Sequence, residues 1–108
     1  MFRHAWAMRE SYKDDAMVLV PCRKCRVDII WPATLASSDR ALFAETARAG
    51  IIAAIQLARS RFGFDGRQAK ALAMHITSAR GTCNRCRRPI TPGEASICEQ
   101  CNAANLDW

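Results

Sequence analysis

All six cysteines of this 108-residue chain occur in Cys-x-x-Cys doublets, namely Cys22/Cys25, Cys83/Cys86 and Cys98/Cys101. Two thiolates separated by two residues can fold into one tight knuckle, so that both sulfurs reach the same ion. A tetrahedral zinc site needs two such knuckles. The spacing of the cysteines therefore predicts that the chain binds metal through sulfur.

The last two doublets supply a complete set of ligands within a short segment. Eleven residues separate Cys86 from Cys98, and they include Pro89, Pro92 and Gly93, which suit a hairpin or turn. This spacing resembles that of a zinc ribbon. We therefore predict one Zn²⁺ ion bound by Cys83, Cys86, Cys98 and Cys101.

The first doublet, Cys22/Cys25, needs two further ligands if the ribbon uses the other four cysteines. His75 is the candidate third ligand, because it falls near the end of a predicted helix, eight residues before Cys83. Pairing the first doublet with Cys83/Cys86 across 57 residues, instead of 11, would cost only about 1.5 kcal/mol more in loop entropy. Two interpretations without metal are a pair of buried thiols and a redox dithiol. A second zinc site that uses Cys22 and Cys25 is the preferred hypothesis.

The sequence favours a cytoplasmic location with reduced thiols. The N-terminal residues are interrupted by charge and lack the apolar stretch of a secretion signal. The longest apolar run, residues 49–58, is too short to span a bilayer. A disulfide framework, the alternative use of the cysteines, would need an oxidising compartment. Because no apolar run is long enough to span a bilayer, we expect no membrane contact.

Positive charge is concentrated in the second half of the chain. The sequence has 16 Lys and Arg residues against 10 Asp and Glu residues, a formal net charge of +6. Residues 59–88 hold eight of these cations and one acidic residue, Asp65. A basic stretch can bind phosphate backbones or acidic protein surfaces, or it can serve only as a solvated face. The candidate partner-binding residues are Arg67, Lys70, Arg85, Arg87 and Arg88.

The predicted fold class is α+β, with small zinc-ribbon and knuckle β elements packed against a three-helix segment. Half of the residues are hydrophobic and 24% are charged, which excludes wholesale disorder. Only 7% are aromatic, so the small core is expected to need metal as a staple. We expect one compact unit with four parts: a flexible arm at 1–16, a first knuckle with strands at 17–33, a helical segment at 34–77, and a zinc ribbon with a C-terminal tail at 78–108.

Capping residues and apolar spacing predict the first helix, and aromatic residues near the two ends of the chain are candidates to pack on the core. Ser37 and Ser38 are candidate N-caps for a helix near residues 39–48, which Gly50 ends. Leu42, Phe43 and Ala47 are expected to face inward. In the arm, Trp6 and Tyr12 are candidates to dock on the body, and at the other end Trp108 is expected to close the core.

Two further helices are predicted between Gly50 and the ribbon. One covers about residues 51–62 and is followed by Gly63, a natural residue after a helix end. The other begins at the cap Asp65, with Gln68 three residues later, and runs to about Ile76. The first of these helices carries one apolar stripe, and the second has its apolar residues on one side. The stripe consists of Ile51, Ile55, Ala58 and Phe62, and the apolar side of Ala69, Leu72, Ala73 and Ile76.

Several residues of segment 50–76 match the helix–turn–helix of a known family. They are Ile55, Arg59, Gly63, the hydrophobic Phe64, Ala69 and Lys70. On these residues the segment resembles the C-terminal domain of the bacterial ribosomal stalk protein. That family has a second glycine where Asp65 stands and a leucine where Gly66 stands, so the turn departs from its pattern. In the family these helices contact translation factors, so the resemblance implies a partner-binding surface that includes Lys70 and Arg67.

Groups able to do acid–base chemistry are scarce in the sequence. It has no Gly-rich phosphate loop and no Ser-His-Asp arrangement, and its two histidines, His4 and His75, lie far apart. Cys22, Cys25 and His75 could hold a catalytic zinc, as in cytidine deaminases, but the His-x-Glu pattern of those enzymes is missing.

The sequence therefore favours a non-catalytic, small bacterial zinc-binding protein that acts by binding another protein. Such a protein would be an adaptor, an inhibitor, or an immunity-type protein that occupies a toxin. The alternative is a basic zinc-ribbon protein that binds nucleic acid in transcription or translation, because cations surround the knuckles. Aromatic residues for base stacking are few near these cations, which counts against that alternative.

Overall fold

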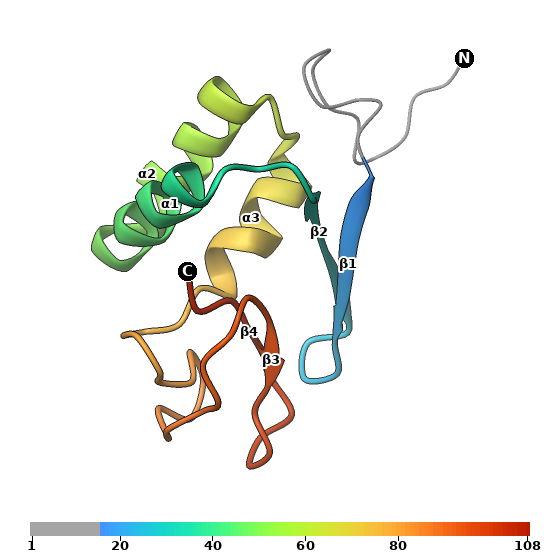
Figure 1. Ribbon diagram of the computed structural model, residues 1–108, viewed down its shortest axis with the longest axis vertical. Helices are drawn as coiled ribbons and strands as arrows, with labels where there is room; N and C mark the ends of the chain where they lie inside the picture. The colour runs from blue at the N-terminus through green and yellow to red at the C-terminus, as the bar shows by residue number, and fades with distance from the viewer. Residues whose placement is uncertain (1–15) are drawn as a thin grey trace.

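The computed structural model describes residues 16–108, which form an α+β fold (Figure 1). In the sequence, one antiparallel two-stranded sheet, β1–β2, precedes the helical segment and a second, β3–β4, follows it, so the predicted fold class is confirmed. The elements are β1 (Met17–Cys22), β2 (Val27–Pro32), α1 (Ser37–Ala49), α2 (Ile51–Leu57), the π-helical turn η1 (Ala58–Phe62), α3 (Gly66–Met74), β3 (Ser96–Ile97) and β4 (Ala104–Asn105).

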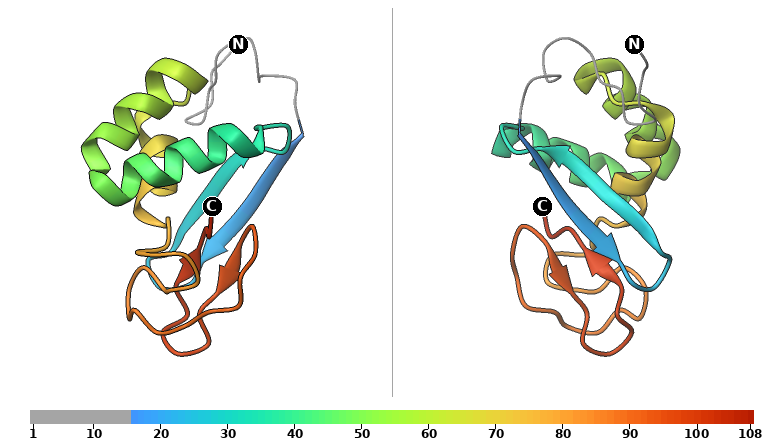
Figure 2. Two further views of the ribbon diagram at one scale, coloured as in Figure 1. Left: turned by 60° about the vertical axis from the view of Figure 1, so that its left-hand side comes forward. Right: turned by 90° about the vertical axis from the view of Figure 1, so that its right-hand side faces the viewer.

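The two strands of the hairpin β1–β2 differ in burial. Along β1 half-buried residues such as Val18 and Val20 alternate with exposed ones, and Val18 lies opposite Trp31 of β2. The last four residues of β2, 29–32, are buried. The Gln68 side chain of α3 donates to the carbonyl oxygen of Ile30 at 2.9 Å. The hairpin is therefore fixed to α3, and its turn points away from the other helices toward the C-terminal segment (Figure 2).

Helix α1 begins earlier than the sequence predicts. Its N-cap is Ala36, which makes no side-chain cap hydrogen bond, and Ser37 and Ser38 are the first two helical residues. Their predicted role as N-caps is therefore wrong, because the chain turns into the helix one residue before them. Gly50 ends the helix as predicted, in an extended conformation. Phe43 and Ala47 are buried as predicted, but Leu42 is 37% exposed and lies on the solvent side.

The second predicted helix is divided in two. Residues 51–57 are α-helical, whereas residues 58–62 form the wider π turn η1. The wider turn has slightly more than four residues, so Ala58 and Phe62 both remain on its buried side. Gly63 follows with φ of 74°, a left-handed conformation that glycine adopts at low cost.

Helix α3 is capped as the sequence predicts. The Asp65 side chain accepts a hydrogen bond from the backbone N–H of Gln68 at 2.8 Å. The helix ends at Met74, and its buried face includes Ala69, Leu72 and Ala73. His75 directly follows the last helical residue, so its side chain is held at the C-terminal end of α3.

The C-terminal segment returns to the main core after forming β3 and β4. The Leu106 N–H donates to the His75 carbonyl at 2.8 Å, and Leu106 is fully buried. The Trp108 ring packs edge-on against Trp31, with 5.2 Å between ring centroids, and lies 6.2 Å from Phe43. Its indole N–H donates to the carbonyl oxygen of Glu94 at 2.9 Å. The prediction that Trp108 closes the core is confirmed.

The predicted arm at 1–16, with Trp6, Tyr12 and His4, lies outside the described residues except for residue 16. Among residues 16–108, no helix has the length and apolar character needed to cross a bilayer.

Candidate metal centre

The four cysteines of the predicted ribbon come together at the end of the molecule that carries β3 and β4. Cys83, Cys86, Cys98 and Cys101 each direct a sulfur into one group whose ligand atoms all lie within 4.8 Å of one another. This group could hold a metal ion. The prediction that these four residues share one location is confirmed, and local pairing is preferred over pairing Cys83/Cys86 with the first doublet.

Two sulfur–sulfur separations in this group are close to those of a tetrahedral zinc site. Cys83 Sγ lies 3.6 Å from Cys101 Sγ, and Cys86 Sγ lies 3.6 Å from Cys98 Sγ. A tetrahedral zinc ion with bonds of about 2.3 Å would hold two sulfurs about 3.8 Å apart. The observed separations are also far longer than a disulfide bond of about 2.05 Å, so all six cysteines are free thiols.

Crowding of the sulfurs makes them unequal as acids. Burial opposes ionisation of Cys83, but hydrogen bonds from the backbone of Arg85 and Cys86 outweigh it and lower the pKa of this thiol to about 6. Burial and the neighbouring thiols raise the pKa of Cys101 to about 11. Without a cation the group therefore does not carry four negative charges at neutral pH. A divalent metal would offset the repulsion among the thiolates and displace the remaining protons.

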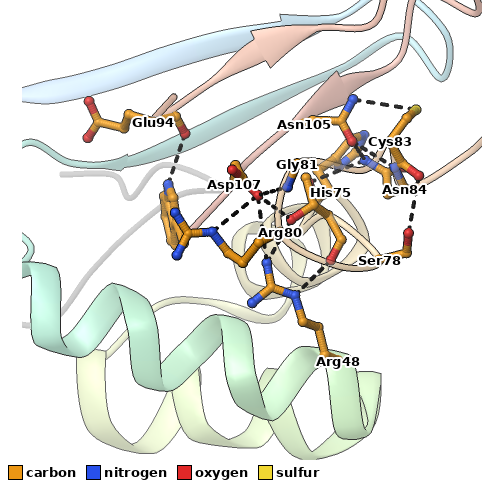
Figure 3. Close-up of polar contacts among 12 residues, drawn as sticks. Arg48, His75, Ser78, Arg80, Gly81, Cys83, Asn84, Glu94, Asn105 and Asp107 are labelled. Carbon is orange, nitrogen blue, oxygen red and sulfur yellow. Dashed lines mark hydrogen bonds and ion pairs between the residues drawn. The ribbon is translucent and has the colours of Figure 1, made fainter. Parts of the chain in front are cut away.

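Two asparagines that the sequence analysis did not single out support this group. The Asn105 side chain donates to Cys83 Sγ at 3.5 Å, and its oxygen accepts from the Asn84 backbone N–H at 2.7 Å (Figure 3). The Asn84 side chain donates to the carbonyl oxygens of Ala104 at 2.9 Å and His75 at 3.3 Å. These contacts join residues far apart in sequence, which is why spacing alone could not reveal them.

The first doublet and His75 form a second group. Cys22 ends β1, Cys25 lies in the following turn, and His75 reaches them from the end of α3. Their three ligand atoms lie within 4.8 Å of one another, so this group could also hold a metal ion. Cys25 Sγ and His75 Nε2 are 3.1 Å apart. Tetrahedral zinc would separate such a pair by about 3.6 Å, so a small outward shift would accommodate the ion.

The His75 ring is oriented as a metal ligand requires. Its Nδ1 lies 2.6 Å from the Ala71 carbonyl oxygen, to which it can only donate, and this fixes the tautomer with a free lone pair on Nε2. Burial and the positive charge of Arg85 lower the pKa of His75, against the effect of the Ala71 contact. The ring is therefore neutral at pH 7, the form that binds metal.

The two sulfurs of the first doublet also differ. Burial opposes ionisation of Cys22, but the backbone N–H of Ala104, which donates at 3.4 Å, and N–H groups of its own turn lower the pKa of this thiol. Burial and the adjacent Cys22 raise the pKa of Cys25. Cys22 therefore loses its proton more readily than Cys25 does, and the hydrogen bond from Ala104 ties the first doublet to β4.

The three knuckles share one backbone feature. Among residues 16–108, the non-glycine residues with positive φ are Arg26 (61°), Arg87 (66°) and Asn102 (67°). Each directly follows the second cysteine of a doublet. The left-handed conformation costs a non-glycine residue about 1 kcal/mol, so its presence at all three positions indicates that all three doublets adopt the same knuckle. The first doublet therefore has the local geometry of the two that form the four-cysteine group.

Positive side chains surround a cavity of about 520 Å³ next to the second group. Cys22, Cys25 and His75 all line this cavity. Five cations from three separate segments also line it: Lys24 and Arg26 from the first knuckle, Arg67 and Lys70 from α3, and Arg85 from the second knuckle. We call this lining the basic cavity.

The structure brings together only some of the predicted partner-binding residues. Arg67, Lys70 and Arg85 share the basic cavity, whereas Arg87 and Arg88 do not line it. Arg88 instead donates to the Gln100 side chain at 2.9 Å. Lys24 and Arg26 complete the basic cavity, and only the pairing of the hairpin turn with α3 reveals their position.

Comparison of the chain with protein-family models, curated proteins and solved structures finds no match. The resemblance of segment 50–76 to the ribosomal stalk family therefore stays a prediction, although α2, η1 and α3 do form two helical stretches joined at Gly63.

Proposed function

We propose that the chain is a non-catalytic zinc-binding protein of the cytoplasm that binds an acidic surface of another protein through the basic cavity. The observation that supports this most is the convergence of five cations from three segments on one recess. Within the described part of the chain, Asp28 is the single acidic residue that lines it. Such a concentration of one sign of charge in a recess attracts and orients a partner of opposite sign.

Zinc is the metal that the ligand sets favour. Thiolate and imidazole ligands in tetrahedral arrangement are typical of structural and catalytic zinc sites, and the separations of 3.6 Å fit zinc–sulfur bonds. Reduced thiols, which zinc requires, persist in the cytoplasm. We therefore assign one Zn²⁺ to the four-cysteine group and a second to Cys22, Cys25 and His75.

A protein partner is favoured over nucleic acid by the shape and lining of the site. Among residues 16–108, no Phe, Tyr or Trp side chain lines the basic cavity, so this part of the chain offers it no platform for base stacking. Apolar groups such as Val27 and Met74 lie among the cations. A projecting acidic loop of a protein can fill such a recess, as an adaptor target, an inhibited enzyme or a toxin would. Nucleic acid is the alternative, because Arg87 and Arg88 add exposed charge nearby.

A site-directed crosslink tests this function. Met74 lines the basic cavity and is 48% exposed, so a photoreactive residue at this position would touch a bound partner. In the native cells we expect one discrete protein adduct. Arg67→Glu should abolish it, because the reversal repels an acidic surface. Arg59→Glu, the same change on an exposed helical arginine outside the basic cavity, should leave it intact.

Two outcomes would count against the proposal. One is an adduct that nuclease treatment removes, which would favour nucleic acid. The other is a set of protein adducts equally abundant in wild type, Arg67→Glu and Arg59→Glu, which would show that the basic cavity selects no partner.

A further inference from the structure

The second metal group has fewer protein ligands than a closed zinc site. Among residues 16–108, the group contains Cys22, Cys25 and His75 and no fourth member. Structural zinc sites use four protein ligands, whereas three protein ligands leave a position for an exogenous ligand. We propose that the metal held by Cys22, Cys25 and His75 binds an oxyanion, of the carboxylate or phosphate class, at its fourth position. This inference rests on the second metal of the proposed function, but it requires no protein partner.

The open position faces a space that can hold a ligand. All three ligand residues line the basic cavity, whose volume of about 520 Å³ falls within the range typical of small-molecule sites. None of the cysteines of the four-cysteine group lines this cavity. The two sites therefore differ in access: one is closed by its own sulfurs, and the other meets solvent through the recess.

Charge favours an anion at this position. A divalent metal with two thiolates and a neutral imidazole has no net charge, so it does not repel an anion as a tetrathiolate site would. Five cations and one acidic residue, Asp28, line the cavity within residues 16–108, and this excess of positive charge supplies the attraction. Arginine is suited to the task because its guanidinium matches the geometry of carboxylate and phosphate oxygens.

Arg85 connects the two metal groups. Its backbone N–H donates to Cys83 Sγ at 3.4 Å, so the knuckle of the four-cysteine group fixes its position. Its side chain lines the basic cavity, and its charge acts on Cys25 and His75. The closed site thereby positions a cation beside the open one, which gives the closed site a role beyond stability.

Cobalt substitution provides the test. The protein loaded with two Co²⁺ ions per chain has visible bands that report the ligands of each ion, and the four-cysteine site serves as an internal reference. We expect inorganic phosphate or acetate to shift the bands of the second site saturably and to leave those of the four-cysteine site unchanged. Comparison of the two probes identifies which oxyanion class the site prefers.

Variants separate the roles of the residues. Arg67→Gln combined with Lys70→Gln should retain both metals and weaken binding of the preferred anion at least tenfold, whereas the control Arg59→Gln should match wild type. His75→Gln should lose the second metal and the anion response while the bands of the four-cysteine site persist. That persistence distinguishes a lost site from an unfolded protein.

Three results would overturn the inference. The first is a metal content of one per correctly folded wild-type chain. The second is the absence of any spectral response to phosphate and acetate. The third is a changed spectrum of Asp28→Asn in anion-free buffer, since this would make Asp28 the fourth ligand. A positive anion response without any protein crosslink would reject the proposed function and retain the inference.

Discussion

The two metal groups differ in how the chain assembles them. The four-cysteine group is built from residues 83–101. Among residues 16–108, the buried members of the cluster around it are Cys83, Cys98 and Ala103, with partly buried residues packed against them. The other group joins the hairpin turn to the end of α3, with 50 residues between Cys25 and His75 in sequence. It also adjoins the main core, which includes Cys22, Leu72 and Ile76. The four-cysteine group thus lies in a segment with little hydrophobic core of its own. The second group instead connects elements that already share the main hydrophobic core.

This difference predicts unequal dependence on metal. A domain of this size is marginally stable, and a segment with three buried residues has little apolar area to offset its conformational entropy. Structural zinc contributes on the order of 10 kcal/mol to folding in small metal-binding peptides. Removal of the ion from the four-cysteine group should therefore have a larger effect than removal from the second group.

The largest effect is expected for Cys83→Ser. Loss of this thiolate should release the metal of the four-cysteine group and unfold residues 82–103, because the local core cannot hold them. Limited proteolysis should then cleave after the arginines of this segment, and metal analysis should give one zinc per chain instead of two. Unchanged melting and unchanged protease resistance after complete removal of metal would contradict this role.

The matched variant is His75→Gln, which retains a polar side chain of similar reach at the second group. We expect loss of one zinc and a destabilisation of about 2 kcal/mol, typical of a single buried polar substitution. Protease resistance of the four-cysteine segment should remain. If His75→Gln and Cys83→Ser gave the same proteolysis pattern, the two groups would form one cooperative unit and the distinction between them would be lost.

Sequence reasoning placed Cys83, Cys86, Cys98 and Cys101 in one group because their spacing is local. It also placed the caps at Asp65 and Gly63, since these depend on residue type within one turn. It failed at Ser37, where two adjacent serines allow more than one start for α1, and it could not foresee the π turn at 58–62. Sequence reasoning could not predict these features because tertiary packing determines them.

The second site shows the same limit. His75 was named as a candidate because of its place near a helix end, but its orientation depends on the Ala71 carbonyl and on the approach of the hairpin turn. The supporting asparagines, Asn84 and Asn105, lie 21 residues apart and act only in the folded chain. Residue type indicates that a side chain can bind metal, whereas its partners depend on the fold.

An intermediate effect on stability is expected for substitution of Asp107, whose side chain connects the C-terminal residues to the start of the four-cysteine segment. Its carboxylate accepts from Thr77 Oγ1 and from the Gly81 N–H, both at 2.9 Å, and lies 3.4 Å from Arg80 Nε (Figure 3). Burial opposes ionisation, but these hydrogen bonds and the Arg80 charge outweigh it and lower the pKa of Asp107. Asp107→Asn should cost about 1–3 kcal/mol of unfolding free energy at pH 7.

The pH dependence of that cost follows from the direction of the shift. Because the pKa of Asp107 is lower in the folded state, its contribution is complete above the unfolded-state pKa of about 4. The contribution is lost as the pH falls through the folded-state value. In urea unfolding of both proteins, the difference between wild type and Asp107→Asn should therefore shrink below pH 4. If the difference in unfolding free energy stayed constant down to pH 2, the effect of Asp107→Asn would come from changed packing and not from loss of the carboxylate charge.

The smallest effect tests whether the knuckles are equivalent. Arg26 and Arg87 hold positive φ angles of 61° and 66°, a conformation that glycine adopts without a Cβ clash. Arg26→Gly and Arg87→Gly should therefore each stabilise the metal-loaded protein by up to about 1 kcal/mol. Arg23→Gly, in the same turn but without positive φ, should destabilise it, because glycine there only adds freedom to the unfolded chain. Melting temperatures of the three variants measure these effects.

The knuckles would not be equivalent if Arg26→Gly destabilised the protein while Arg87→Gly stabilised it. The Arg26 side chain would then stabilise the group of Cys22, Cys25 and His75, and the knuckles would differ in energy as well as in access to solvent.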